Sequence, residues 1–310
     1  MSYWLRHVVA AYGLLRDVDI VHDNSMVGPI YAPGIPSAPV VTTNHGPFNE
    51  ILTPVYRAIS QRTPVIAISH HQASEAEGVS IAAVIHHGID VERIPFGTGT
   101  GGYAAFLGRM HPNKGVEDAI TAARTAGMPL RIAAKMTEPA EREYFMTRIA
   151  PHLGGDVEFI GELRRTEKYD LLKEAVCLLN PIRWAEPFGM VMIEAMACGT
   201  PVVTNNRGSA SEIVDDGKTG FLCDDSYSLE RALRQVESLS RSHCREVVEC
   251  RFSSRRMAAD HIALYRRTIK GGEDCSDTDR PGEATLRCPG VEVARHNRRS
   301  ITKPGSVSVI

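Results

Sequence analysis

Two glutamates, Glu186 and Glu194, flank a short stretch whose residue types suit an anion-binding turn. The apolar run at 176–179 predicts a buried strand, and the pattern at 190–198 predicts a helix. The turn between them lies at the carboxyl end of a strand and the amino end of a helix. Free backbone N–H groups and the helix dipole attract anions at such a point. Gly189, just before the helix, lets the backbone approach a ligand closely.

Glu194 falls in an apolar part of the predicted helix, among Val191, Ile193 and Met196. A carboxylate in such surroundings is costly unless it has a partner. Ionisable groups in this position are frequently functional, so we predict that Glu194 binds a ligand. The alternative is that Glu194 serves only the fold, as a helix cap or as one half of a salt bridge.

Two cationic residues, Arg109 and Lys114, follow a second predicted strand at 103–107 and precede a helix at 116–125. The carboxyl ends of parallel strands meet at one edge of a sheet, so we expect both side chains near Glu186. A guanidinium clamps two oxygens at once and an ammonium adds a point charge, which together suit phosphate. The alternative is that both residues form ordinary surface salt bridges.

Four stretches, one of which contains the glutamate pair, form a longer pattern. They read FLGRMHPNKG at 106–115, EPFGMVMIEAMACGTPVV at 186–203, and GSASEIV at 208–214 followed by GKTGFL at 217–222. Together they resemble the family 4 retaining glycosyltransferases, which have the GT-B architecture. The resemblance covers roughly residues 20–265.

The resemblance implies that a nucleoside-diphosphate sugar is the donor and that an acceptor hydroxyl receives the sugar with retention of configuration. It further implies that Glu194 holds the donor ribose and that Glu186 contacts sugar hydroxyls near the reacting carbon. Arg109 and Lys114 would neutralise the charge of the departing diphosphate. Gly108 belongs to the same donor-binding edge of the sheet.

Further donor contacts are implied for the turn and for the first half of the chain. Backbone N–H groups of Phe188, Gly189 and Met190 would point toward sugar or phosphate. His45 follows a predicted strand and would contact the donor sugar, the alternative being a loop histidine with no function. The acceptor is not identified by the sequence and is a small molecule, a glycan or a lipid.

No metal and no other cofactor is expected. Members of the family usually need no metal, and no Asp-x-Asp lies near the site. The pairs His70-His71 and His86-His87 suggest chelation at first sight. Adjacent residues on a strand point to opposite faces, however, so neither pair is a natural chelate. His87 stands where the family typically has asparagine, which is a departure from its pattern.

The expected fold class is α/β, a GT-B arrangement of two Rossmann-like domains facing a cleft, with the first domain incomplete. Short apolar segments alternate with helices in both halves of the chain, as in doubly wound parallel sheets. The expected divisions are a partial acceptor-side domain at 1–96, a Gly-rich linker at 97–102, a donor-binding domain at 103–255, a crossover helix at 256–270 and a disordered tail at 271–310.

The linker segment GTGTGG at 97–102 superficially suits a phosphate-binding loop. No strand precedes it and no Gly-Lys-Ser/Thr sequence closes it, so we interpret it as a flexible connection.

The beginning of the chain departs from the family. Nothing before Asp19 resembles the strand and glycine-rich loop that should open the first domain, so that domain is expected to be truncated. Two functions follow: a working glycosyltransferase with a reduced acceptor domain, or a non-catalytic remnant that binds nucleotide sugar. A GT-B sugar-nucleotide epimerase would share the fold but not usually this arrangement of glutamates.

Composition sets the remaining expectations. The 310-residue chain has 43% hydrophobic residues and a net charge of −2, so neither nucleic acid nor an acidic membrane is an expected partner. No apolar run is long enough to span a bilayer, and the first residues do not read as a signal peptide. The seven cysteines form no Cys-x-x-Cys pair and indicate a reducing, cytoplasmic environment without structural zinc.

Overall fold

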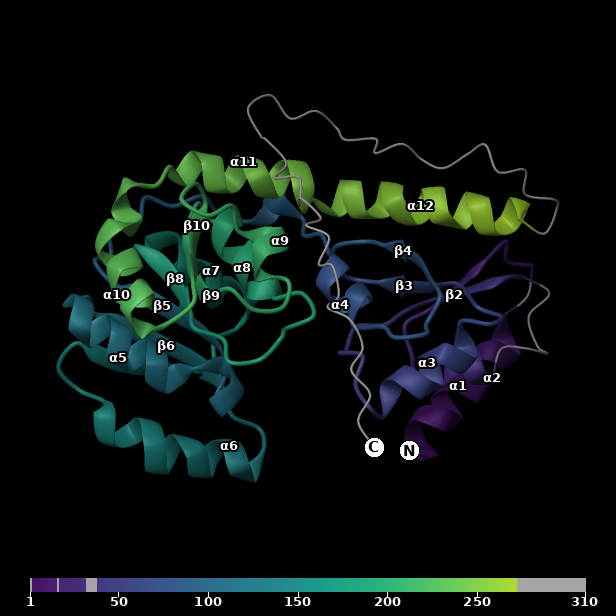
Figure 1. Ribbon diagram of the computed structural model, residues 1–310, viewed down its shortest axis with the longest axis horizontal. Helices are drawn as coiled ribbons and strands as arrows, with labels where there is room; N and C mark the ends of the chain where they lie inside the picture. The colour runs from purple at the N-terminus through teal and green to yellow at the C-terminus, as the bar shows by residue number, and fades with distance from the viewer. Residues whose placement is uncertain (1, 16, 32–37, 272–310) are drawn as a thin grey trace, which may run out of the picture. The chain divides into compact units, whose positions relative to one another are not determined.

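The structure, a computed structural model, describes residues 2–15, 17–31 and 38–271. The tail expected to be disordered, 271–310, lies outside the described residues except for Gly271. The described part contains two parallel β-sheets, each with helices packed against it (Figure 1). The α/β class and the pair of Rossmann-like sheets expected from the sequence are therefore confirmed.

The first sheet is parallel throughout and has the strand order β1-β2-β3-β4. Its strands are β1 (Val21–Asp23), β2 (Val40–Thr43), β3 (Val65–Ala67) and β4 (Ile81–Val84). The helices of this part, which we call the first lobe, are α1 (Ser2–Leu14), α2 (Gly28–Tyr31), α3 (Leu52–Ile59) and α4 (His70–Ser74). The sequence predicts strands at 19–22, 39–44, 64–69 and 82–86, and each observed strand begins and ends within about two residues of the corresponding range.

The second sheet is also parallel and has the order β10-β9-β8-β5-β6-β7. Its strands are β5 (Ala104–Arg109), β6 (Leu130–Lys135), β7 (Val157–Gly161), β8 (Cys177–Asn180), β9 (Val202–Asn205) and β10 (Gly220–Cys223). The helices of this second lobe are α5 (Val116–Ala126), α6 (Pro139–Tyr144), α7 (Arg165–Glu174), α8 (Met190–Ala197), α9 (Ala210–Ile213), α10 (Ser226–Gln235) and α11 (Arg241–Arg251).

The order of the second sheet reverses at β5, because β6 and β7 lie on one side of it and β8 to β10 on the other. Such a reversal separates the loops that leave neighbouring strands and opens a ligand crevice at the carboxyl edge. The loop after β5 and the loop after β8 lie at this point. These are the loops that carry Lys114 and Glu186.

One helix differs from its predicted form. The sequence predicts continuous helix from Ala140 to Ala150, whereas α6 ends at Tyr144 and gives way to a π-helical turn, Phe145–Ile149. A short 3₁₀ turn follows, and it contains Pro151. Proline has no N–H for a helical hydrogen bond, so the regular helix cannot continue through this residue.

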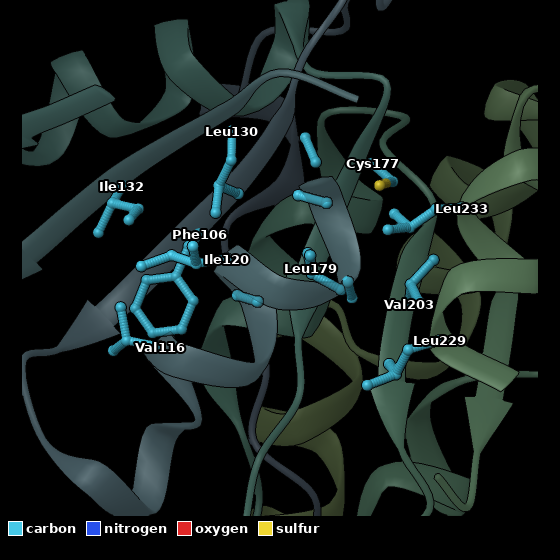
Figure 2. Close-up of a cluster of buried hydrophobic side chains, with 14 of the residues drawn as sticks. Phe106, Val116, Ile120, Leu130, Ile132, Cys177, Leu179, Val203, Leu229 and Leu233 are labelled. Carbon is cyan, nitrogen blue, oxygen red and sulfur yellow. The ribbon is translucent and has the colours of Figure 1, made fainter. Parts of the chain in front are cut away.

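The core of the second lobe lies between the sheet and its helices (Figure 2). Phe106 of β5 is 1% exposed and sits among Leu130, Ile132, Leu179 and Val203, which are fully buried. Strands covered by helices on both faces need apolar side chains at successive positions, which accounts for the unbroken apolar runs in the sequence. This packed sheet is the rigid support of the loops at its carboxyl edge.

The connection between the lobes is hydrogen-bonded along its length. Backbone N–H groups of Gly97, Gly99 and Gly101 donate to carbonyls of the second lobe at 3.0, 3.1 and 2.9 Å. The Arg241 guanidinium donates to the Gly97 carbonyl at 3.0 Å. These hydrogen bonds attach the segment 97–102, which the sequence predicts to be a linker, to carbonyl groups of the second lobe.

The last described helix, α12 (Ser254–Lys270), begins two residues before the crossover helix expected at 256–270. It returns to the first lobe and lies along its sheet (Figure 1). Leu264 packs there against Val41, Ile66 and Ile85, all of which are buried. A helix near the end of the described residues thus completes the core of the first lobe.

No helix among the described residues combines the length and the hydrophobicity needed to cross a bilayer.

Replacement of Phe106 by alanine should destabilise the protein by about 3–5 kcal/mol, because it leaves a cavity beneath the central strand. Urea unfolding followed by circular dichroism measures the difference. Met146→Ala is the matched control, since Met146 is 65% exposed and its loss should cost no more than about 0.5 kcal/mol. Equal effects of the two substitutions would contradict this description of the core.

Candidate functional site

The turn after β5 is bound tightly to the end of β8. The His111 side chain accepts a hydrogen bond from the Asn113 N–H at 3.1 Å and so begins the 3₁₀ turn that carries Lys114. Gly115 has φ 73° and passes so close to the Pro181 carbonyl that a Cβ at this position would collide with it. Glycine is required here both for the left-handed backbone and for the close approach. The result is that Lys114 faces the loop after β8.

Lys114 and Glu186 form an ion pair between Nζ and Oε1. Their side chains are only 19% and 16% exposed, so the charges are largely removed from water. The second carboxylate oxygen of Glu186, Oε2, is buried and has no hydrogen-bond partner among the described residues. A buried acceptor without a partner is unfavourable, and a ligand hydroxyl would satisfy it. The structure thus brings two of the sequence-predicted site residues together.

The amino end of α8 faces the same place. Gly189 has φ 82°, and its Cβ position would lie 3.6 Å from Oε2 of Glu186. The Met192 N–H donates to the Gly189 carbonyl at 3.1 Å, and the N–H groups at the start of this helix carry the positive end of the helix dipole. Phe188 is 2% exposed, whereas Met190 is 36% exposed. The turn therefore places a carboxylate oxygen that has no partner among the described residues beside the amino end of α8.

The loop after β9 supports the Glu186 turn from behind. Ser209 donates its N–H to the Glu186 carbonyl at 3.1 Å and its hydroxyl to the Phe188 carbonyl at 2.6 Å. A Cβ on Gly208 would collide with the backbone of Glu186. These contacts fix the turn through its backbone and leave the carboxylate available.

Glu194 lies inside the second lobe and is 9% exposed. Its Oε1 accepts from Lys168 Nζ at 2.7 Å, and Lys168 comes from α7. The salt-bridge alternative weighed for Glu194 is therefore present in the structure. Its contact with a donor ribose stays a prediction.

Arg109 ends β5, directly after Gly108, and it forms a two-donor contact with Glu141 of α6. Nε and Nη2 of the guanidinium both donate to Oε1, at 2.8 and 2.6 Å. The side chain of Arg109 is 57% exposed, while that of Glu141 is 1% exposed. Among the described residues Arg109 forms no ion pair with Glu186 or Glu194. Its contact with phosphate also stays a prediction.

Glu141 is itself held by the backbone. Its Oε2 accepts the N–H groups of Thr137 and Glu138 at 2.8 and 3.1 Å. The Glu138 N–H, the Arg109 guanidinium and the Thr137 N–H lower the pKa of Glu141 to about 2. The buried carboxylate therefore stays ionised and fixes the guanidinium at the carboxyl edge of the sheet.

His45 lies after β2 and pairs with two other side chains. Its Nε2 is 2.8 Å from the Asn24 Oδ1, and its Nδ1 is 3.5 Å from the His87 Nε2. The His45 and His87 rings stack at 5.3 Å, and His87 in turn lies 5.1 Å from the Phe188 ring. Burial lowers the pKa of His45, which favours the neutral imidazole. His45 is thus connected to the Glu186 turn through His87.

A second contact joins the lobes at Glu212 of α9. Its carboxylate accepts the backbone N–H groups of His70 and His71 at 2.7 Å each, so it caps the amino end of α4. His86 Nε2 lies 2.8 Å from the same carboxylate. The ligand atoms of His70, His86 and Glu212 all lie within 4.8 Å of one another, which makes them a candidate metal-binding group in the described residues. Both carboxylate oxygens already accept N–H groups, and the cap is the function that the contacts support.

Several of these residues were not found by sequence reasoning. Lys168 and Glu212 are joined to their partners across 26 and 142 positions of the sequence, so no local spacing predicts them. Asn24 follows β1 by one residue and carries no motif. Glu141 did have a signal, because Glu138 and Glu141 have the spacing of a capping box, which the structure contains.

Two parallel sheets of this kind, each covered by helices, have the arrangement of the GT-B fold. The family model described as "Glycosyl transferases group 1" matches residues 93–249, just over half of the chain. The chain belongs to this family.

Two curated relatives from mycobacteria are similar to the chain. It is 37% identical over 172 residues to the glycogen synthase of Mycobacterium tuberculosis (strain CDC 1551 / Oshkosh), covering 51% of this chain and 40% of that protein. It is 28% identical over 250 residues to the phosphatidyl-myo-inositol mannosyltransferase of Mycolicibacterium smegmatis, covering 70% and 61%. The chain thus spans less than two thirds of the length of these relatives.

A solved structure agrees with the fold. The Anabaena protein Alr3699/HepE, described in complex with UDP and glucose, superposes with a TM-score of 0.69. The match has 21% sequence identity and covers 84% of this chain and 80% of the other. At this identity the similarity establishes the GT-B fold alone.

Replacement of Glu141 by glutamine should lower the melting temperature near pH 7, because the ionised carboxylate is stabilised in the folded protein. The pKa of Glu141 is lower in the folded state than its ordinary value of 4.5, so its contribution is complete above that pH. The contribution disappears as the pH falls toward about 2. Thermal melts of both proteins at pH 7, 5 and 3 measure the effect.

The matched control is Glu143→Gln, an exposed position on the same helix, which should change the melting temperature little at any pH. A difference between the parent and Glu141→Gln that stays constant or grows on acidification would refute the described environment of Glu141.

Proposed function

We propose that the protein is a retaining glycosyltransferase that moves a sugar from a nucleoside-diphosphate sugar to an acceptor hydroxyl. The observation that carries this proposal is the partly buried pair of Lys114 and Glu186 beside the amino end of α8. One oxygen of Glu186 is buried without a partner among the described residues, and the positive end of the α8 dipole lies next to it. A ligand with hydroxyl and phosphate groups would satisfy both.

The reaction exchanges one bond of the donor for one bond to the acceptor. The bond between the anomeric carbon and the diphosphate oxygen breaks, and its electron pair leaves with the nucleoside diphosphate. A bond between the anomeric carbon and the acceptor oxygen forms, and the hydroxyl proton passes to the departing diphosphate. Negative charge grows on the diphosphate, so fixed positive groups lower the barrier.

The residue assignments combine this chemistry with the family resemblance. Lys114 and Arg109 would neutralise the diphosphate, with Glu141 holding the guanidinium in position. Glu186 would accept a sugar hydroxyl through Oε2. Glu194 would bind the ribose hydroxyls. In the free protein Lys168 compensates the negative charge of Glu194.

The remaining assignments concern the edges of the site. Backbone N–H groups at Phe188, Gly189 and Met190 would bind sugar or phosphate oxygens. Gly108 would let the donor approach the end of β5, since it carries no side chain. His45 would contact the donor sugar, and no resident metal takes part in the proposed reaction.

The relatives support the donor class. The Anabaena protein is described with UDP and glucose, and the two mycobacterial relatives are named as a glycogen synthase and a mannosyltransferase. Because the chain spans only 40% and 61% of the mycobacterial proteins, a second function is weighed against transfer. In this second function the chain binds nucleotide sugar without turnover.

A donor screen tests the proposal. UDP-glucose, GDP-mannose and ADP-glucose are each added to the purified full chain, and the thermal shift is measured. At least one should stabilise the parent protein. Lys114→Ala and Glu194→Ala should each weaken the binding of that donor by about 10- to 100-fold, because each removes a charge-assisted contact.

Lys218→Ala is the control for loss of a cation, since Lys218 is exposed in the turn before β10. Release of nucleoside diphosphate in the presence of an acceptor mixture separates the two functions. Release that depends on acceptor supports transfer, whereas stabilisation by donor without any release supports binding alone. If neither Lys114→Ala nor Glu194→Ala alters the donor response, the site assignment is wrong.

A further inference from the structure

One histidine from each of the two adjacent pairs comes to the same place in the fold. His70 begins α4, shortly after β3, and His86 follows β4 by two residues. Because β3 and β4 are neighbours in a parallel sheet, the loops that leave their carboxyl ends lie close together. The two imidazole rings are 5.7 Å apart and meet edge to face. Neither adjacent pair is a natural chelate, but the fold brings His70 and His86 together.

Glu212 of α9 adds a carboxylate to these two rings. The ligand atoms of His70, His86 and Glu212 all lie within 4.8 Å of one another, and His86 Nε2 is 2.8 Å from Oε2 of Glu212. The ligand atoms of a tetrahedral zinc ion, with bonds of about 2.0–2.2 Å, are roughly 3.3–3.5 Å apart. His70 is exposed, so a rotation of its side chain can close the remaining difference.

The cap of α4 does not account for the imidazoles. Glu212 accepts the backbone N–H groups of His70 and His71, which any residue other than proline could donate. The His70 imidazole forms no hydrogen bond with a described residue. A carboxylate has about four lone-pair sites, so a cap of two N–H groups leaves capacity for a metal. The cap also holds the carboxylate beside the His86 ring.

Neighbouring arginines hold two of the three residues in place. Arg251 donates to the Glu212 carbonyl, and Arg256 donates to the His86 carbonyl at 2.8 Å. Each guanidinium also forms an ion pair with an aspartate, at 2.8 and 2.9 Å, so each positive charge has a counter-charge beside it. Outer contacts that orient metal ligands in this way increase the affinity for the metal.

The types of ligand determine which ion the group suits. Mg²⁺ and Ca²⁺ prefer sites made of oxygen ligands, whereas imidazole nitrogen suits Zn²⁺ and its neighbours among the transition metals. Two imidazole nitrogens and one carboxylate oxygen, with a fourth position open to water, are a common set for zinc.

We propose that His70, His86 and Glu212 bind a zinc ion, with ligands from both lobes. The metal replaces the hydrogen on His86 Nε2, and the imidazole keeps its proton on Nδ1. Water fills the fourth position. The site adjoins the turn after β8, because the His86 ring is 5.8 Å from the Phe188 ring. None of the three ligands is assigned to the transfer reaction, for which no metal is expected, so the inference does not rest on the proposed function.

Zinc binding is measured on the full chain after a chelator has removed bound metal, in a buffer that keeps the cysteines reduced without binding zinc. Isothermal titration calorimetry with zinc chloride should show a site with a dissociation constant of about 10 µM or tighter. Magnesium chloride at the same concentrations should give no heat of binding. A weaker zinc site, or equal binding of magnesium, overturns the proposal.

His70→Ala locates the metal. The substitution removes an exposed imidazole but keeps the backbone N–H that Glu212 accepts, so the cap of α4 is preserved. The affinity for zinc should fall at least about tenfold, because one of three ligands is lost.

His71→Ala is the matched control for loss of an imidazole. His71 is the next residue of the same helix and also donates its N–H to Glu212, but its ring is not part of the group. This variant should bind zinc like the parent. Unchanged binding in His70→Ala, or an equal loss in both variants, contradicts the assignment.

Glu212→Gln tests the ligand from the second lobe. The amide keeps an acceptor oxygen for the cap but lacks the negative charge that favours a zinc ligand. Zinc affinity should again fall at least about tenfold. If Glu212→Gln binds zinc as tightly as the parent, the second lobe supplies no ligand and the proposed site is wrong. These titrations contain no nucleotide sugar, so their failure leaves the transferase proposal standing, and failure of the donor screen leaves the zinc site standing.

Discussion

The ion pair between Lys114 and Glu186 is the interaction on which the rest of the site depends. It exists because β5 and β8 are neighbours in the sheet although 72 positions separate the two residues. Two charges taken out of water cost free energy unless they are paired and hydrogen-bonded. Lysine meets that requirement for one carboxylate oxygen and leaves the other without a partner among the described residues. The fold therefore stabilises the glutamate and keeps its capacity to bind.

Much of the fold could be predicted from sequence, because apolar runs separated by turns report burial directly. The long motif around Glu186 also indicated the family. The pairing of Glu194 with Lys168 could not be predicted, since it depends on how α7 packs beside α8. Glycine content suggested a flexible segment at 97–102, but hydrogen-bond partners on the second lobe are a tertiary property. Sequence thus located the candidate ligand-binding residues better than the side chains that orient them.

The two lobes differ in the charge state of their ionisable side chains. On the second lobe, cations are partly buried against carboxylates, as with Lys114 and Glu186. On the first lobe, burial keeps imidazoles such as His22 and His87 neutral.

The contacts of the Glu212 carboxylate make each lobe depend on residues from the other part of the chain. It belongs to α9 but satisfies two N–H groups at the start of α4, and α12 likewise fills the core of the first sheet from the far end of the sequence. An excised first lobe would expose backbone donors and aliphatic surface that are covered in the whole chain. If the chain were divided at the glycine-rich connection 97–102, the first lobe would lose the hydrogen bonds of Glu212 and the packing of α12.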